Sequence, residues 1–399
     1  MRILFAMPVV PWPTTSGLKV RSFYLARELA LRHEVHLLCL ANTPIKPGQR
    51  QVIEAAGLRL TLVDKPRKSF IAKAAAYLRS LVNGTPTYFI LSWEAEIFDA
   101  IGKLEKDISA DVAVAEHLFM ARYITELSCP KVLVEHNVES NLHLMMAGSL
   151  GIPQRWIKKA ASAWFANYER RMLGRMQWIV SVSQDDAKTL DDMSTGVEIS
   201  VVENGVSCEE YKELYESPPQ AAGALLYIGS MGYVPNVDAV KWFSTDILPG
   251  ILEKSPETVV FVAGSETPSE LYGLDDGVNR RILGFVEDIK PLYGDASIFV
   301  VPLRMGGGSR LKILEAFAAG RPVVSTSIGA AGIDVTHGEH LLLADTPEDF
   351  SRAVLKLQED GDLYEKLRDN ARRLVEEKYD WPVLARKFEA AIERAAKQK

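Results

Sequence analysis

The sequence has little of several features that mark particular classes of protein. It contains three cysteines in 399 residues, and their odd number and wide spacing build neither a disulfide ladder nor a zinc pair. Apolar runs fall short of the roughly 20 residues that a membrane-spanning helix needs. The apolar start, MRILFAMPVV, is short and soon meets prolines, so we interpret it as a buried strand and not as a secretory signal. We therefore expect a cytoplasmic protein with reduced thiols.

Two motifs that would point to other chemistry are also missing. We identify no Asp-x-Asp metal motif at the end of a predicted strand, and no G-x-G-x-x-G follows the first strand. The second absence disfavours a nicotinamide dehydrogenase. The formal net charge of -6 argues against nonspecific binding to nucleic acid.

Positive charge nevertheless gathers in the first half of the chain. Residues 65–81 hold five basic and no acidic side chains, and residues 155–178 mix six basic side chains with Trp, Phe and Tyr. Such segments are typical of helices that lie on an anionic membrane surface, here its inner face. They are equally typical of amphipathic helices that pack their aromatic side chains into a core. The sequence leaves both interpretations open.

Short β-branched runs alternate with longer segments of helical period, which predicts βαβ units and parallel sheets. The length favours two domains. We expect an N-terminal Rossmann-like domain over 1–205, a Pro-containing linker over 206–222, a C-terminal ligand-binding domain over 223–378, and a final helix within 379–399 that returns towards the first domain. In open parallel sheets, ligands bind at the carboxyl ends of the strands. The fold class is therefore α/β, with two Rossmann-like domains facing across a cleft.

The segment between Val301 and Val335 carries the strongest chemical signal. A predicted strand ends near Pro302, a glycine-rich turn follows, and an amphipathic helix begins near Ser309 or Arg310. Glycines allow close approach of an anion, and the amides of a helix start favour negative charge. The residues that we expect to bind a diphosphate here are Arg304, Gly306, Gly307, Gly308, Ser309, Arg310, Leu311 and Lys312. Glu315 lies one turn into the helix, in a place to accept hydrogen bonds from the two hydroxyls of a ribose.

With these motifs the chain resembles a family 4 glycosyltransferase of GT-B fold. The resemblance also covers PWPTTSGLKVRSFYLARELA, VVENGV, YIGSMGYVPNVDAVKWF and GFVEDIKPLYGDASIFVVPLR. It implies a retaining enzyme that uses a nucleotide sugar, with a UDP- or GDP-sugar as the expected donor and no separate cofactor. Of the two glutamates usual in the family, Glu315 matches the second, whereas Gly307 stands at the first. This departure resembles a subgroup with the pattern P-x-R-x-G-G-G-x-R-x-K-x-x-E-A. The family's Arg and Lys pair near the start of the second domain is also absent, and Arg310 and Lys312 are our candidates for that charge.

The resemblance implies further contacts. Backbone groups of Gly284, Phe285 and Val286 are expected at the nucleobase, and Gly17 at the donor phosphates or the acceptor, where Lys19 and Arg21 would face the cleft. A His that touches the donor sugar corresponds to Glu116 or His117, and we name both. Glu135, His136, Asn137 and Glu139 follow the next strand and are expected at the substrate as well.

The predicted function is metal-independent transfer of a sugar to a glycan, a lipid-linked molecule or a small acceptor in polysaccharide or glycoconjugate biosynthesis. The predicted catalytic residues are Glu116, His117, Arg310 and Lys312. The leaving phosphate oxygen would itself accept the acceptor's proton. Alternatives are a sugar-nucleotide epimerase or a phosphorylase of the same architecture, or a sugar-binding protein without catalysis.

Overall fold

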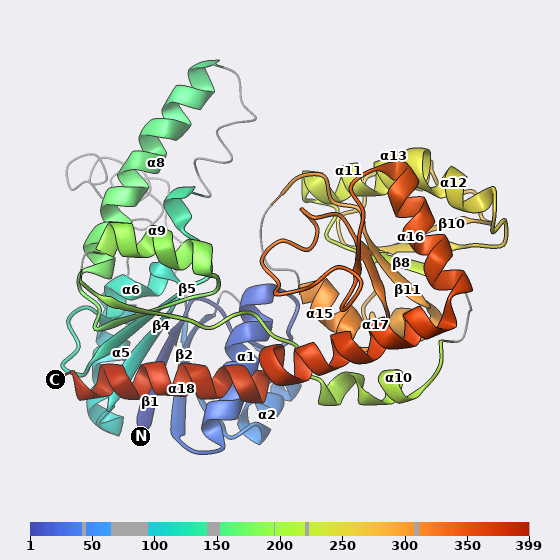
Figure 1. Ribbon diagram of the computed structural model, residues 1–399. Helices are drawn as coiled ribbons and strands as arrows, with labels where there is room; N and C mark the ends of the chain where they lie inside the picture. Colours follow the sequence, from blue (N-terminus) through green and yellow to red (C-terminus); the bar gives the residue numbers. More distant parts are fainter. Residues whose placement is uncertain are drawn as a thin grey trace. The chain divides into compact units, whose positions relative to one another are not determined.

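A computed structural model describes residues 1–41, 45–64, 95–141, 152–194, 196–219, 223–306 and 311–398, with the side chains of 152–161 and 194 left out. The chain divides into two compact α/β units (Figure 1). Unit 1 consists of Met1–Glu203 and Leu384–Lys399, and unit 2 consists of Asn204–Val383.

Unit 1 is built on a seven-stranded parallel sheet in the order β3-β2-β1-β4-β5-β6-β7. Its strands are β1 (Arg2–Met7), β2 (Glu34–Ala41), β3 (Leu58–Asp64), β4 (Val112–Glu116), β5 (Lys131–Glu135), β6 (Trp178–Ser181) and β7 (Glu198–Val201). Its helices are α1 (Gly17–Ala30), α2 (Pro47–Ala55), α5 (Ala95–Ile108), α6 (Leu118–Ile124), α8 (Ile152–Leu173) and α9 (Gln184–Ser194). The inner strands are mostly apolar because helices bury both faces of the sheet.

Unit 2 repeats this plan with a six-stranded parallel sheet in the order β10-β9-β8-β11-β12-β13. Its strands are β8 (Leu225–Ile228), β9 (Val260–Ala263), β10 (Arg280–Gly284), β11 (Ile298–Val301), β12 (Val323–Ser325) and β13 (Leu342–Leu343). Its helical elements are η1 (Glu209–Tyr211), α10 (Lys212–Glu216), α11 (Val234–Trp242), η2 (Phe243–Ile247), α12 (Leu248–Leu252), α13 (Ser269–Tyr272), α14 (Lys290–Asp295), α15 (Leu311–Ala318), α16 (Pro347–Glu359), α17 (Gly361–Leu374) and η3 (Val375–Tyr379). The two parallel-sheet units confirm the predicted α/β fold class.

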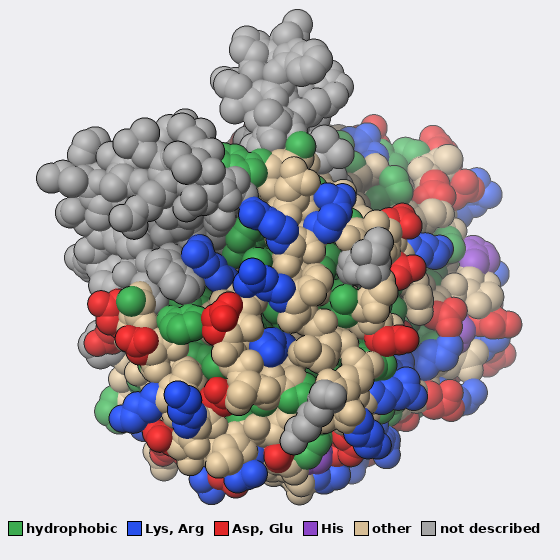
Figure 2. All heavy atoms as spheres, turned by 90° about the vertical axis from the view of Figure 1, so that its left-hand side faces the viewer, with side chains coloured by type: hydrophobic (Ala, Val, Ile, Leu, Met, Phe, Trp, Pro, Cys, Tyr) green, Lys and Arg blue, Asp and Glu red, His purple; other side chains and the backbone are tan. Residues whose placement is uncertain are grey.

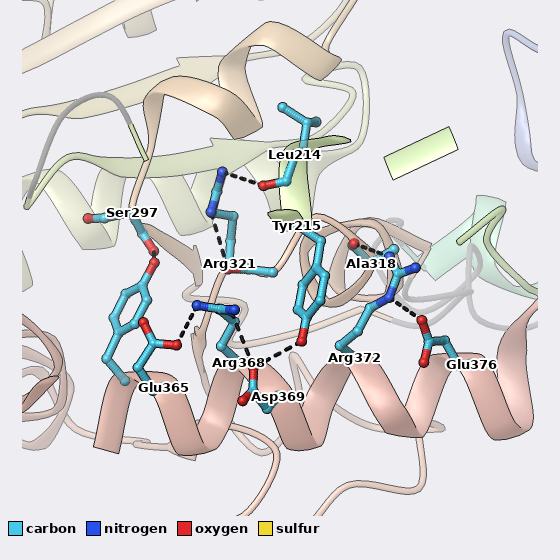
Figure 3. A network of polar contacts seen from close by, with 12 residues as sticks. Leu214, Tyr215, Ser297, Ala318, Arg321, Glu365, Arg368, Asp369, Arg372 and Glu376 are labelled. Atoms are coloured by element: carbon cyan, nitrogen blue, oxygen red, sulfur yellow. Dashed lines mark hydrogen bonds and ion pairs between the residues drawn. The ribbon is translucent and has the colours of Figure 1, made fainter. Parts of the chain in front are cut away.

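Residues 206–219 of the segment expected to be a linker belong to unit 2 and pack against it. It contains η1 and α10, and two arginines bind its backbone: Arg372 donates to the Cys208 carbonyl at 3.1 Å, and Arg321 donates to the Leu214 carbonyl at 3.1 Å. The Tyr215 ring lies between Arg368 and Arg372, at 4.9 and 5.0 Å from its centroid. Figure 3 shows the bond from Arg321 to Leu214 and the Tyr215 ring beside Arg368 and Arg372 of α17. Together with the Cys208 contact, these interactions hold the segment as part of unit 2.

The last helix, α18 (Trp381–Lys397), begins in unit 2 and then belongs to unit 1. Phe388 is fully buried, and its ring centroid lies 6.2 Å from that of Phe5 in β1. Glu389 accepts hydrogen bonds from Arg32 at 2.7 Å and from His33 at 2.6 Å. The helix therefore covers the first strand of the chain and contributes to the core of unit 1.

Candidate functional site

Polar side chains of unit 1 gather where two neighbouring strands end. Strand β4 ends at Glu116, β5 ends at Glu135, and Glu116 pairs in register with Val134. Because both strands are parallel, the residues that follow them, His117 and His136, leave the same edge of the sheet. Their rings stack, with centroids 6.3 Å apart and planes inclined by 25°.

His117 is held in an unusual backbone conformation. Its φ is +87°, a region that residues other than glycine seldom occupy and that often marks functional sites. The side chain caps α6: Nδ1 accepts a hydrogen bond from the Phe119 amide at 3.1 Å. Nε2 lies 3.0 Å from a carboxylate oxygen of Glu139. Since Nδ1 is an acceptor, the neutral ring carries its proton on Nε2 and donates it to Glu139.

Glu116 forms the second histidine–carboxylate pair. Its side chain is fully buried, and Oε2 lies 2.9 Å from Nε2 of His136. Burial lowers the pKa of His136, and the Glu116 carboxylate partly offsets this effect. The His117 side chain is 21% exposed. Of our two catalytic candidates at this strand end, His117 therefore reaches the surface, whereas Glu116 lies beneath it.

Glu135 differs from our expectation that it contacts substrate. It is 1% exposed, and burial together with the charges of Glu169 and Glu139 raises its pKa well above the ordinary value. Glu169, from α8, accepts hydrogen bonds from the Glu139 amide at 2.8 Å and from the Ser140 hydroxyl at 2.6 Å. Glu135 and Glu169 are thus buried acidic side chains. Glu169 holds the backbone that follows His136 through its hydrogen bonds with Glu139 and Ser140.

Gly17 is the first residue of α1, and among the described residues the Ser16 side chain makes no capping hydrogen bond to that helix. The amides of its first turn are therefore available to an anion. We expected Arg21 to face a cleft, but it is fully buried and donates to the Glu203 carbonyl at 2.6 Å. Burial lowers its pKa to about 10 against the opposing effects of Glu116 and Glu203.

In unit 2, Glu315 of α15 is held by two neighbours. The Tyr293 hydroxyl donates to Oε2 at 3.1 Å, and Nζ of Lys312 lies 2.9 Å from the same oxygen. Burial and the Glu315 charge raise the pKa of Tyr293 well above its ordinary value, so the hydroxyl stays protonated and donates. Glu315 remains 17% exposed and Lys312 39% exposed. The carboxylate is thus fixed in orientation and still accessible. Sequence reasoning missed Tyr293 because no local signal links it to Glu315.

The backbone at Gly306, the last described residue before α15, requires glycine. Gly306 has φ +105°, and a β-carbon there would lie 2.8 Å from the Tyr233 hydroxyl and 3.1 Å from Pro235. The next four predicted site residues, Gly307, Gly308, Ser309 and Arg310, lie outside the described residues. The described part of α15 begins at Leu311.

Arg304, which follows β11, is engaged by neighbours. It donates to the Asp238 carboxylate at 2.6 and 3.1 Å, and its guanidinium carbon lies 5.1 Å from the Trp242 ring centroid. The Asp238 hydrogen bonds raise the pKa of Arg304, so it keeps its charge. Asp238 therefore competes with any anion for this arginine, a partner that the sequence did not reveal.

The predicted nucleobase contacts lie at the end of β10. Gly284 accepts a hydrogen bond from the Gly264 amide at 2.8 Å, so this carbonyl is already used. Phe285 is 73% exposed and Val286 is half-buried. The exposed ring offers a flat apolar surface beside the strand end. Across the described part of the chain, His, Cys, Asp and Glu side chains form no group of three or more that would hold a metal ion.

The basic helix expected at residues 65–81 lies outside the described residues. In the second basic segment, Tyr168 and Trp178 are 2% and 5% exposed, so these two rings pack inside. Arg170, Arg171 and Arg175 are exposed. Figure 2 views the molecule from the left-hand side of Figure 1, where α8 lies, and Lys and Arg side chains cluster on this face. None of the helices within the described ranges has the length and apolar character needed to cross a bilayer.

Two family models match the chain. The one described as Glycosyltransferase Family 4 matches residues 15–210, and the one described as Glycosyl transferases group 1 matches residues 222–360. Solved structures align along its whole length. A glycosyltransferase from Rickettsia africae is 15% identical with a TM-score of 0.69, and covers 100% of this chain and 99% of its own. Anabaena HepE, solved with UDP and glucose, is 13% identical with a TM-score of 0.66, over 99% and 100% of the two chains.

Curated relatives match shorter segments. An uncharacterised protein from the cps region of Klebsiella pneumoniae is 26% identical over 39% of this chain and 42% of its own length. Glycogen synthase of Mycobacterium tuberculosis is 27% identical over 47% and 46% of the two chains. The chain thus spans about half the length of the curated relatives it matches. From the family models on its two units and the fold shared with solved glycosyltransferases, this chain is a family 4-type glycosyltransferase of GT-B fold.

Proposed function

We propose that this protein is a retaining, metal-independent glycosyltransferase that moves a sugar from a UDP- or GDP-sugar to a glycan, a lipid-linked molecule or a small acceptor. The observation that carries the proposal is Glu315, fixed by Tyr293 and Lys312 just after the Gly306 turn. A carboxylate in this place, accessible and oriented, suits the two hydroxyls of a ribose. Structures with similar folds include Anabaena HepE solved with UDP and TarM solved with UDP.

The donor diphosphate is assigned to Gly306, to the glycine-rich sequence that follows it, and to Lys312 of α15. Backbone amides at a helix start and the cation of Lys312 stabilise the negative charge of a leaving diphosphate. Arg310 and Arg304 add positive charge in the same stretch of sequence. Arg304 takes part only by exchanging its Asp238 contact for the phosphate. We assign to these groups the stabilisation of the leaving diphosphate's negative charge, which a metal ion provides in other sugar transferases.

In the proposed reaction the bond between the anomeric carbon and the diphosphate oxygen breaks. A new bond forms between that carbon and an acceptor hydroxyl oxygen on the same face, which retains the configuration. The hydroxyl proton passes to the leaving phosphate oxygen, so the step is balanced without a separate protein base. Water must be excluded for transfer to compete with hydrolysis of the donor.

His117 is the residue that we assign to the donor sugar. Its Nδ1 is committed to the α6 amide, so a sugar hydroxyl is reached through Nε2, in competition with Glu139. Glu116 is assigned a positioning role: it holds His136, against which the His117 ring stacks. Strain at His117 fixes the direction of the ring before substrate arrives.

We base the proposed acceptor class on the relatives that the chain matches and on the positive charge exposed near the end of α8. Matched proteins include phosphatidyl-myo-inositol mannosyltransferases, one of which is 27% identical over 54% of this chain and 55% of its own. Exposed arginines at the end of α8 suit an anionic interface. We therefore propose a cytoplasmic enzyme in peripheral contact with the inner face of a membrane, acting in polysaccharide or glycoconjugate biosynthesis.

Thermal-shift measurements with UDP, GDP, ADP and TDP sugars test the donor site, followed by mass spectrometry of products on lipid and glycan acceptors. Glu315→Ala and Lys312→Ala should each weaken binding of the stabilising nucleotide by about tenfold, because each removes a charged contact. Arg352→Gln, at an exposed arginine on α16, serves as the control. Wild-type affinity in both site variants would place the nucleotide elsewhere. Nucleotide binding without transfer to any acceptor would instead favour a sugar-binding protein.

A further inference from the structure

Two polar side chains of α8, Ser162 and Glu169, lie on one face of the helix about two turns apart. Both are buried. The helix packs beside α6 in unit 1 (Figure 1). A buried carboxylate or hydroxyl costs free energy to desolvate unless it has hydrogen-bond partners. The partners of these two residues therefore show what this face of α8 holds.

Both side chains bind the segment that follows β5. One oxygen of Glu169 accepts a hydrogen bond from the Glu139 amide at 2.8 Å. The other accepts from the Ser140 amide at 3.3 Å and from the Ser140 hydroxyl at 2.6 Å. The Ser162 hydroxyl donates to the Ser140 carbonyl at 2.8 Å. The backbone becomes helical at Glu139, and since the first amides of a helix have no partner within it, the Glu169 carboxylate satisfies them.

The segment that α8 holds carries the carboxylate in contact with His117. The Glu139 side chain is 14% exposed, and its Oε1 lies 3.0 Å from Nε2 of His117. Nδ1 of the same ring accepts from the Phe119 amide, so the neutral ring has one N–H, and it points at Glu139. The ring thus has two anchors, α6 through Nδ1 and the Glu139 segment through Nε2. A shift of Glu139 would remove the second anchor.

We propose that Glu169 and Ser162 are positioning residues, which fix the Glu139 backbone and, through the Glu139 carboxylate, the direction of the His117 ring. The inference rests on the role in transfer that the proposed function gives to His117. Because Glu169 and Ser162 are buried, they act on transfer through His117 and not by touching the sugar themselves. A misdirected N–H loses its hydrogen bond to a sugar hydroxyl, since these bonds weaken steeply with angle.

Glu105 of α5 offers a matched control within the same unit. It is also buried, and its Oε1 accepts hydrogen bonds from the Ser128 amide at 2.6 Å, the Ser128 hydroxyl at 2.8 Å and the Cys129 amide at 2.9 Å. Ser128 and Cys129 precede β5, whereas Glu139 follows it, so the two sets lie at opposite ends of the strand. Glu169→Gln and Glu105→Gln therefore disturb the same kind of contact with and without a connection to His117.

The first measurement is a double-mutant cycle on kcat/KM for the donor and acceptor identified by mass spectrometry. Glu169→Gln should lower kcat/KM about fivefold in the wild-type background and cause no further loss in the His117→Gln background. Ser162→Ala, a milder change, should lower it about twofold with the same dependence on background. Glu105→Gln should lower Tm as Glu169→Gln does and keep the wild-type kcat/KM. Nucleotide affinity should be unchanged in every variant.

A second measurement needs no activity. Diethyl pyrocarbonate modifies the ring nitrogen that lacks a proton, which in His117 is the Nδ1 bound to the Phe119 amide. Loss of the second anchor should free the ring and raise its modification rate, read by mass spectrometry, about threefold in Glu169→Gln and not in Glu105→Gln. His337, whose Nδ1 also accepts from a backbone amide, that of Leu343 at 2.9 Å, serves as internal reference.

Equal losses of kcat/KM from Glu169→Gln with and without the His117 side chain, or an unchanged modification rate of His117, would overturn the proposal. A wild-type rate in His117→Gln would instead refute the role of His117 in transfer. In that case the modification rate alone decides whether Glu169 positions the ring: a faster reaction in Glu169→Gln supports it, and an equal one rejects it.

Discussion

Replacing Tyr293 with phenylalanine isolates one hydrogen bond at the donor site. The ring is fully buried and packs against Tyr211 and Phe299, with centroids 5.9 and 5.6 Å away, and phenylalanine keeps these contacts. What is lost is the hydroxyl that donates to Glu315 at 3.1 Å. A hydrogen bond to a charged group contributes about 1.5–3 kcal/mol. Lys312 still holds the carboxylate, so we expect the lower end of this range.

A loss of about 1.4 kcal/mol corresponds to a tenfold increase in Kd. Tyr293→Phe should therefore weaken nucleotide binding by about tenfold, measured by isothermal titration calorimetry. The matched control is Tyr364→Phe, which removes another partly buried hydroxyl of unit 2, one that donates to the Ser297 carbonyl at 2.9 Å. It should lower thermal stability without changing nucleotide affinity. Equal affinity in wild type and Tyr293→Phe, with stability lowered in both variants, would refute a role for Tyr293 in orienting Glu315.

Three further predictions follow from other contacts. His117→Gln should lower kcat/KM by about tenfold or more and leave nucleotide affinity unchanged; a wild-type rate would remove His117 from the site. Arg372→Met leaves two buried carbonyls without their donor and should cost about 3 kcal/mol in urea unfolding, whereas the exposed Arg373→Met should cost under about 0.5 kcal/mol. The pKa of Glu135 is raised in the fold, so its contribution to stability is complete below the unfolded value of about 4.3 and is lost as pH rises through the folded value. Glu135→Gln should therefore raise Tm above wild type near pH 8 and lose this advantage near pH 4; a gain independent of pH would contradict the reasoning.

The strands were predictable because a strand that is buried on both faces consists largely of apolar residues, and such short apolar runs are easily recognised in a sequence. Runs such as ILFAM and IFVV are apolar throughout, and they lie in β1 and β11. Parallel topology followed from the helical segments between them. The anchoring of Cys208 and Leu214 could not be predicted, because Arg372 and Arg321, which bind their carbonyls, lie more than 100 residues further along the chain.

The sequence predicted which polar residues follow the strand ends, but not the direction in which their side chains point. Glu116, His117 and Glu135 were singled out because they lie at the ends of predicted strands. Which of their side chains points to the surface depends on the backbone conformation after the last paired residue. The structure shows that φ at His117 is positive and that its ring contacts Glu139, while Glu116 and Glu135 stay buried. The ion pair between Arg304 and Asp238 was not predictable either, because the two residues are 66 positions apart and no local sequence pattern links them.

The helix α18 has a consequence for the order in which the protein is made. Phe388 and Glu389 complete the layer over Phe5 and His33, but the ribosome releases them only after all of unit 2. Unit 1 is thus completed only after unit 2 has been synthesised, and until then the surface around Phe5 stays uncovered. A truncation anywhere between residues 204 and 388 would therefore damage the core of unit 1 although it leaves every strand of that unit in place.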